Sequence, residues 1–311
     1  MIHALRSTLW NAVDGKARVP WLILVPLVGA YGCLILVSEA AILLEMPLPL
    51  AQLLISGAPV VAALGLLRLS SHFLGDPRTL ADYDVMVNAG WLRELLMGLG
   101  IGAVGVAIPY LIGLATGVLR VSATMDGGDL PLGLGVLLVV AAMLCTGFWE
   151  ELLLRGVFIS NARDGLRRWL SPSRALIGGL TISSLVFGLA HLGQPEIPAF
   201  ILTWILAGVV FGLIYLFSGN LALGIGAHAA FNITANTVFV RTDISGTEHF
   251  SALTRITVES DASILGVGGA VEASGFLLVL ALGLLWIRLS TGVITLQGLP
   301  LSHPPRALAQ E

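Results

Sequence analysis

Three short pieces of the sequence carry acids, imidazoles and a carboxamide, groups that can move protons and hold negative charge. They are 150–155 (Glu-Glu-Leu-Leu-Leu-Arg), 187–191 (Phe-Gly-Leu-Ala-His) and 228–232 (His-Ala-Ala-Phe-Asn). A carboxylate or a carboxylate–imidazole pair can take a proton from water. An imidazolium or an amide N–H can stabilise the tetrahedral oxyanion of acyl transfer. Together the pieces supply the parts for hydrolysing an amide bond.

Helical spacing separates the two adjacent glutamates of the first piece. Neighbouring residues of a helix point about 100° apart, so Glu150 and Glu151 cannot face the same way. Glu151 and Arg155 are four residues apart, which predicts an ion pair on one face. Glu150 is then left on a neighbouring face, free for chemistry. His228 and Asn232 have the same spacing and are expected to share a face.

Each piece taken alone also has an ordinary structural interpretation. Glutamates can mark the membrane edge, and a histidine in a transmembrane helix often makes an interhelical hydrogen bond. His191 lies beside Gly193 and Pro195, where a solvated histidine at a helix end is ordinary. A zinc site is a further alternative, since Glu150, His191 and His228 would leave a fourth position open for water. The sequence lacks the His-Glu-x-x-His motif of many zinc proteases, which favours metal-free chemistry.

The composition places these polar pieces in a membrane protein. Hydrophobic residues make up 56% of the 311, charged residues 11%, and the mean hydropathy is +0.93. A soluble domain carries about 25% charged residues. Ionisable side chains within a bilayer are costly, so they are functional candidates by default. The net charge of −3 and the lack of a basic stripe argue against a nucleic-acid partner. Cys33 and Cys145 lie in apolar runs and are interpreted as buried hydrophobes.

Eight apolar stretches are long enough to cross a bilayer, given about 20 residues per crossing. They lie near 20–44, 50–67, 95–118, 131–153, 176–193, 198–217, 221–240 and 264–287. We therefore predict an all-α, polytopic transmembrane helix bundle of about eight spans, with a four-helix catalytic core. The glycines of 98–102 fit close helix contacts in lipid. Residues past 290 are predicted to form a short polar tail.

Lysine and arginine alternate between the loops as the positive-inside rule requires. The side that we assign to the cytoplasm holds Arg6, Lys16, Arg18, Arg68, Arg78, Arg93, Arg155, Arg163, Arg167, Arg168, Arg174, Arg288 and Arg306. The opposite side holds Arg120, Arg241 and Arg255, diluted by neighbouring acidic residues. This pattern predicts an even number of spans with both termini in the cytoplasm. We expect the membrane to be the cell membrane.

With these span boundaries, Glu150 and His191 would lie at different depths in the membrane. Glu150 falls near the cytoplasmic end of span four. His191 falls about 22 Å along span five if that span begins at Leu176, at about 1.5 Å per residue. Span five could begin late, it could be strongly tilted, or Glu150 could lie deeper than these boundaries place it. We favour the late start, because Pro172 and the glycines at 178 and 179 would loosen its first turns. Glu39, in span one, is a lone acid without an obvious partner.

The three pieces resemble the CAAX protease and bacteriocin-processing family of intramembrane proteases, which includes the type 2 CAAX prenyl endopeptidases. The resemblance covers spans four to seven, roughly 131–240, with the motifs in order and no departure at the key positions. It implies that Glu150 is the general base that activates water, and that His191 assists it or holds the water. It also implies that His228 and Asn232 stabilise the oxyanion. The supporting positions of the motifs are Glu151, Arg155 and Phe187.

The family resemblance leaves the cofactor and the substrate open. The mechanism has been described both as metal-dependent and as driven by glutamate alone, so zinc on Glu150, His191 and His228 stays an alternative. Family members in eukaryotes trim the three residues after a prenylated cysteine. Many prokaryotic members have no such substrate, and some are linked to bacteriocin processing or resistance. The expected partners are therefore the lipid bilayer and a membrane-associated peptide or protein substrate.

The resemblance divides the chain into three parts. Residues 1–130 are N-terminal transmembrane helices outside the recognised core, and 131–240 are the protease core. Residues 241–311 hold an extracytoplasmic loop, the last transmembrane helix and a cytoplasmic tail. The resemblance says little about the first and third parts.

Two other functions are kept beside the endopeptidase. One is a proton- or ion-coupled transporter whose polar path runs through Glu39, Glu150, His191 and His228. The sequence shows no convincing internal repeat, which would have favoured a transporter. The other is a catalytically silent membrane scaffold. A protease needs its polar residues to converge around one place, whereas a transporter needs them spaced along a path.

Overall fold

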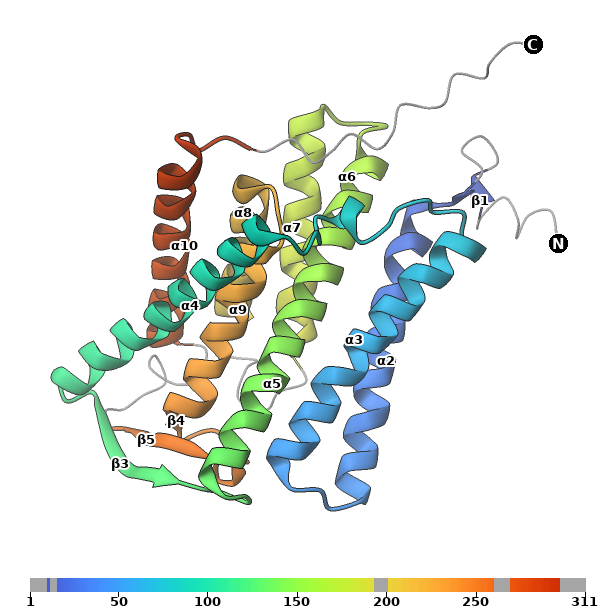
Figure 1. Ribbon diagram of the computed structural model, residues 1–311. Helices are drawn as coiled ribbons and strands as arrows, with labels where there is room; N and C mark the ends of the chain where they lie inside the picture. The colour runs from blue at the N-terminus through green and yellow to red at the C-terminus, as the bar shows by residue number, and fades with distance from the viewer. Residues whose placement is uncertain (1–9, 12–15, 193–200, 260–268, 297–311) are drawn as a thin grey trace, which may run out of the picture.

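The computed structural model describes residues 10–11, 16–192, 201–259 and 269–296. Most of them form a bundle of long helices (Figure 1). The long helices are α2 (Val19–Leu43), α3 (Leu48–Phe73), α4 (Ala89–Ala115), α5 (Leu132–Glu151), α7 (Pro172–Ala190), α8 (Ile201–Ser218), α9 (Ala222–Ile233) and α10 (Ala270–Thr291). The shorter helical segments are η1 (Ala81–Tyr83), α6 (Ser160–Leu166), η5 (Thr247–His249) and two π-helical segments, η2 (Leu152–Ile159) and η4 (Thr234–Val238).

Seven helices among the described residues are long and apolar enough to cross a membrane. This confirms the predicted all-α, polytopic membrane fold. The seventh predicted stretch, 221–240, is the exception: it forms a helix of only 12 residues, α9, followed by η4 and a short strand. Every residue from Ala222 to Phe231 is buried, and α9 packs against α4, α5 and α8. Its apolar sequence therefore reflects burial within the protein rather than contact with lipid.

Glycines allow α9 to lie this deep. A Cβ atom at Gly98 of α4 would overlap the carbonyl oxygen of Leu223, and one at Gly102 would overlap that of Ala227. On α9 itself, a Cβ at Gly226 would overlap the carbonyl oxygen of Leu95. The close contacts predicted for 98–102 are therefore present, because small residues let helix backbones approach closely.

A small sheet that the hydropathy pattern does not predict caps one end of the bundle (Figure 1). Its strands are β3 (Leu119–Asp126), β4 (Phe239–Arg241) and β5 (Ala252–Val258), in the order β3-β5-β4. β5 pairs antiparallel with β3 and parallel with β4. Arg255 on β5 forms an ion pair with Asp126 and donates to the carbonyl oxygen of Thr247 at 2.8 Å. Two further short strands pair near the N-terminus, β1 (Trp10–Asn11) and β2 (Lys16–Ala17).

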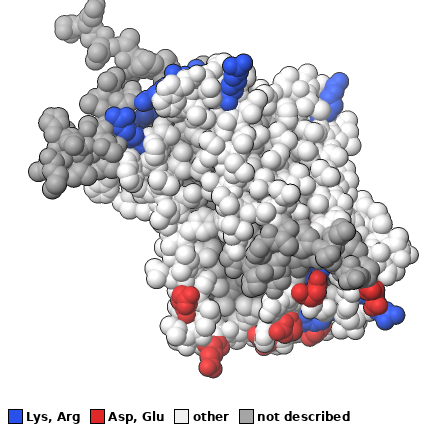
Figure 2. All heavy atoms as spheres, turned by 180° about the vertical axis from the view of Figure 1, so that it is seen from behind, with Lys and Arg blue, Asp and Glu red and all other residues white. Residues whose placement is uncertain are grey.

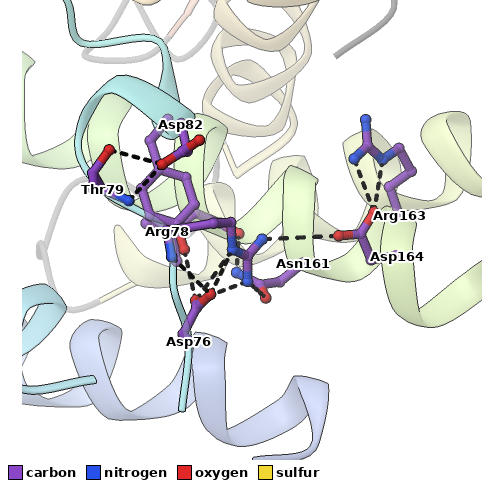
Figure 3. A network of polar contacts seen from close by, with 9 residues as sticks. Asp76, Arg78, Thr79, Asp82, Asn161, Arg163 and Asp164 are labelled. Carbon is purple, nitrogen blue, oxygen red and sulfur yellow. Dashed lines mark hydrogen bonds and ion pairs between the residues drawn. The ribbon is translucent and has the colours of Figure 1, made fainter. Parts of the chain in front are cut away.

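At the other end, a loop between α3 and α4 is fastened to α6 by the group that we call the loop clasp (Figure 3). Its members are Asp76, Arg78, Tyr83, Asn161 and Asp164. Arg78 Nε lies 2.8 Å from Asp76 Oδ1, and its Nη2 also donates to Asn161 Oδ1. The Tyr83 hydroxyl donates to Asp76 Oδ2 at 3.1 Å. The clasp thus ties the loop to the helix that follows the first motif.

The predicted depths of the motifs are corrected by two helix boundaries. α5, η2 and α6 run on as one 35-residue helix from Leu132 to Leu166, so Glu150 lies near the middle of this helix and not at its end. α7 begins at Pro172, so the expected late start of span five is wrong. Proline is well tolerated in the first turn of a helix because it gives up only a donor that has no helical partner. His191 at the end of α7 and Glu150 therefore reach similar depths.

The charged residues divide between the two ends of the bundle (Figure 2). Lysine and arginine gather at the end with α6, and most of the acidic residues shown lie at the sheet end. α2 begins and α10 ends at the α6 end (Figure 1), because α9, which is not among the seven candidate spans, also runs from the α6 end towards the sheet end. The assignment of Arg155 to a cytoplasmic loop is wrong, because its side chain is fully buried inside the bundle. Which end faces the cytoplasm stays a prediction, and the polar tail predicted past 290 lies largely outside the described residues.

Candidate active site

The first and third motifs sit where two helices change from α to π geometry. Glu150 and Glu151 are the last residues of α5, and η2 begins directly after them. Asn232 lies near the end of α9, and η4 begins after Ile233. A π-helical turn is rare and occurs frequently at functional sites, because the wider turn changes the direction of the side chains. The two π segments therefore mark the same region as the motifs.

His228 on α9 lies between the two glutamates of α5. Its Nδ1 is 2.8 Å from Glu151 Oε1, and its Nε2 is 3.8 Å from Glu150 Oε2. An ionised carboxylate only accepts hydrogen bonds, so Nδ1 carries a proton and donates it to Glu151. This contact fixes the orientation of the imidazole and turns Nε2 towards Glu150.

Glu151 also contacts Arg155, as the i,i+4 spacing predicts. Arg155 Nε lies 3.3 Å from Glu151 Oε2, and both side chains are almost completely buried. Arg155 Nη2 donates to the carbonyl oxygen of Gly208 on α8 at 3.4 Å. Its guanidinium stands over the Phe187 ring, 4.5 Å from the ring centre. Spacing within one helix did not indicate that Glu151 also holds His228, because that contact joins two helices.

We call Glu150, Glu151, Arg155 and His228 the acid–imidazole cluster. Two of its buried atoms, Glu150 Oε2 and Arg155 Nη1, have no hydrogen-bond partner among the described residues, and Glu151 Oε2 and Arg155 Nε have only their 3.3 Å ion pair with each other. A buried polar group without a partner is costly and rare in native proteins. Glu150 is therefore a buried carboxylate whose Oε2 accepts no hydrogen bond from the described residues.

The second motif supplies His191 from the end of α7. Its Nδ1 lies 2.8 Å from the carbonyl oxygen of Phe187, so Nδ1 is again the protonated nitrogen and Nε2 carries the lone pair. The Phe187 ring contacts both imidazoles, with its centre 4.7 Å from that of His191 and 5.9 Å from that of His228. Gly193 and Pro195 lie outside the described residues.

Two predicted polar residues stand apart from these contacts. Asn232 lies one turn beyond His228 on α9 and is half-buried. No hydrogen bond of its side-chain amide to another described residue is seen, and its predicted oxyanion role stays a prediction. Glu39 is exposed near the end of α2 and does not join the site. Cys33 and Cys145 are free and half-buried, so the prediction that both are buried is wrong.

The site contains two aromatic residues that the motifs do not include, Trp204 and Phe211 on α8. Trp204 stacks on His191 and Phe211 stacks on His228. In the sequence they are two aromatic residues among the apolar residues of a predicted span, and nothing distinguishes them from residues that face lipid. Only the packing of α8 against the motif helices reveals their position.

The residues proposed to bind zinc have suitable chemistry. Both histidines use Nδ1 in hydrogen bonds, which leaves each Nε2 lone pair for another partner, as is usual for histidines that bind metal. Glu150 would supply the third donor. Among the described residues, however, no three His, Cys, Asp or Glu side chains come close enough together to hold an ion. The reaction proposed below uses these side chains and water.

Comparison with known families identifies part of the chain. Residues 132–234 match the family described as type II CAAX prenyl endopeptidase Rce1-like. The matched segment runs from the first residue of α5 to the first residue of η4 and contains all three motifs. It confirms the family resemblance that the motifs indicated, over about the range that they indicated. Comparisons with curated proteins and with solved structures find no match.

Proposed function

We propose that this multi-pass membrane protein, with its Rce1-like segment at 132–234, is an intramembrane endopeptidase in which Glu150 activates water. The observation that carries the proposal is the arrangement of His228 between two carboxylates. One carboxylate, Glu151, is held by Arg155 and fixes the imidazole. The other, Glu150, lies on the free side of the ring and has an oxygen without a hydrogen-bond partner.

The proposed reaction begins when Glu150 takes a proton from a water molecule beside His191. The water oxygen forms a bond to the carbonyl carbon of the peptide, and the carbonyl oxygen becomes an oxyanion. In the reacting state His228 carries a second proton, on Nε2 in place of the free lone pair, and donates from Nε2 to that oxyanion while Glu151 holds Nδ1, with Asn232 as the second donor. Glu150 then returns its proton to the amide nitrogen. The C–N bond breaks, and a carboxylic acid and an amine are released.

The convergence of these groups supports hydrolysis more than transport. His191 and His228 both contact the ring of Phe187. Glu150 in turn lies 3.8 Å from His228 Nε2. Glu39, which a polar path would need, is exposed on α2. For the substrate we propose a C-terminal peptide with a prenylated cysteine, because the family match names that class. A prenyl chain partitions into the bilayer, so it would deliver the peptide bond to a site within the helices.

The test is cleavage of a farnesylated peptide that ends in a CaaX sequence, with the protein in proteoliposomes. Mass spectrometry should detect the released tripeptide with the wild-type protein and not with Glu150→Gln. Glu39→Gln is the matched control, since it changes an exposed carboxylate outside the site and should leave the rate unchanged. The same peptide without its farnesyl group tests the substrate class. Equal cleavage by Glu150→Gln and by the wild type would overturn the proposal.

The role of metal is tested with the same assay. We propose that hydrolysis does not require zinc, so dialysis against a chelator should leave most of the turnover intact. Loss of turnover with the chelator and its recovery with added zinc would show that a metal is needed. In that case Glu150, His191 and His228 are the ligands to test, and each substitution should lower the zinc content of the purified protein.

A further inference from the structure

α8 contributes no acid, base or histidine to the site, yet it contacts both imidazoles. Its sequence from Ile201 to Ser218 contains no Asp, Glu, His, Lys or Arg. Two aromatic residues on it, Trp204 and Phe211, are seven residues apart. This spacing places them on one face of a helix, two turns apart. That face lies against the ends of the second and third motifs.

The two aromatic rings lie nearly parallel to the two imidazoles. The ring centres of Trp204 and His191 are 4.6 Å apart, with 6° between the planes. Those of Phe211 and His228 are 4.7 Å apart, with 11° between the planes. Phe187 contacts both histidines as well, but at tilts of 43° and 67°. The flat contacts therefore come from α8, and the motif phenylalanine supplies tilted ones.

A hydrogen bond at one nitrogen leaves an imidazole with freedom to turn, because the outer torsion of a histidine has broad energy wells. His191 has Nδ1 on the carbonyl of its own helix, and it lies half-buried at the end of that helix. A parallel aromatic face restricts the remaining rotation. Parallel stacking of aromatic rings is also favourable in itself.

We propose that Trp204 and Phe211 are positioning residues that set the ring planes of His191 and His228, and so aim each Nε2 at the reacting groups. The inference rests on the proposed function, because it gives both imidazoles a part in the reaction. It adds two residues that no motif contains. It also gives the last helix a role, since Phe276 on α10 contacts both Trp204 and Phe211 from behind, at ring distances of 6.1 and 5.9 Å.

The kinetic test compares Trp204→Leu, Trp204→Phe and Phe211→Leu with the wild type on the farnesylated peptide. Misplacing a catalytic group by about 1 Å can cost a hundredfold in rate, so each leucine variant should lower kcat by about ten- to a hundredfold. KM should change by less than about threefold, because neither ring is proposed to bind substrate. Trp204→Phe keeps a flat ring and should recover most of kcat. Phe239→Leu is the matched control, since Phe239 stacks on Tyr110 and contacts neither histidine.

A second measurement does not depend on turnover. The protein has six histidines, so the ring signals of histidine-labelled protein form a small NMR set, and His191→Gln assigns the signal of interest. Stacking on indole shifts that signal upfield, and Trp204→Leu should move it downfield while the other histidine signals stay. An unmoved signal would overturn the stacking, and a moved signal with normal kcat would overturn the positioning role. Full cleavage by Glu150→Gln would instead overturn the proposed function and leave the NMR result standing.

Discussion

Two groups of charged side chains inside this protein, the loop clasp and the acid–imidazole cluster, differ in how completely their hydrogen bonds are satisfied. In the loop clasp, Arg78 reaches Asp76, Asn161 and Asp164 (Figure 3), and none of these side chains has a buried atom without a partner. In the acid–imidazole cluster, Glu150 Oε2 and Arg155 Nη1 have no hydrogen-bond partner among the described residues, and Glu151 Oε2 and Arg155 Nε have only their mutual ion pair. Both groups join segments distant in the sequence.

The difference indicates different roles. A fully hydrogen-bonded polar network specifies and rigidifies a structure, whereas an incomplete one carries a cost that the fold must offset elsewhere. Natural proteins break such local rules mainly at functional sites. We therefore interpret the clasp as a structural fastening and the cluster as the site that binds water and substrate. Substitutions in the two groups should separate stability from turnover.

The largest loss of stability is expected inside the cluster itself, for Glu151→Gln. This change leaves the buried guanidinium of Arg155 without its carboxylate, and breaking a buried pair costs about 3–5 kcal/mol. Thermal unfolding in one detergent should show a much lower Tm, together with loss of turnover. Arg155→Ala should resemble it. If Glu151→Gln keeps the wild-type Tm, Glu151 does not have the supporting role given to it here.

A smaller loss is expected in the clasp, for Arg78→Ala. Its partners would keep their positions but lose a donor, and an unsatisfied buried acceptor costs about 1–3 kcal/mol. Tm should fall, while turnover per folded molecule stays at the wild-type value. Arg68→Ala is the control, because Arg68 is exposed on α3. A fall in turnover per folded molecule would show that the clasp also shapes the site.

Asp84, next to the clasp, should make stability depend on pH. Burial raises the pKa of its carboxyl to about 6, against the opposing effects of the Tyr215 hydroxyl and the charge of Arg163. The unfolded value is about 3.9, so the folded protein binds this proton more tightly. Stability should then fall as pH rises from about 4 to 6 and level off above. Tm measured across this range should lose that slope in Asp84→Asn, and an unchanged slope would assign it to another group.

The smallest effect is expected at the sheet end, in the exposed pair of Asp129 and His249. The hydrogen bond between them lowers the pKa of Asp129, with help from the Leu48 N–H, and raises that of His249. The pair therefore stabilises fully between the unfolded values of about 4 and 6.5. The stabilisation is lost as the pH falls through the lowered pKa of Asp129 or rises through the raised pKa of His249. His249→Gln should change Tm only slightly at pH 5, and about 1 M salt should remove the difference; a difference that survives salt would contradict an electrostatic origin.

The contacts of the motif residues could be predicted from the sequence where both partners lie on one helix. The i,i+4 spacing of Glu151 and Arg155 fixes their neighbourhood whatever the rest of the chain does. The contact of Glu151 with His228 could not be predicted in this way, because it depends on how α5 meets α9. The stacking of Trp204 and Phe211 is hidden for a related reason, since lipid and protein are equally apolar neighbours for an aromatic residue.

Helix boundaries and strands were harder to predict from the sequence. The helix that begins at Leu132 continues to Leu166. The hydropathy averaged along the sequence falls where Arg155 and Arg163 are included, so the predicted span ended too early. Those two residues are buried and partnered in the structure, so their polarity does not end the helix. β3 and β5 pair across more than a hundred residues, and no local pattern predicts such a partner.

The measurement that tests the comparison most directly uses Glu150→Gln and Asp76→Asn side by side. Turnover of the farnesylated peptide per folded molecule and Tm are measured for both in the same detergent. Glu150→Gln should lose turnover by a factor of about 10² or more, the usual cost of removing a general base, and keep its Tm. Asp76→Asn should lower Tm and keep its turnover. If Glu150→Gln keeps its turnover, or if Asp76→Asn loses turnover without losing stability, the roles assigned to the two groups are contradicted.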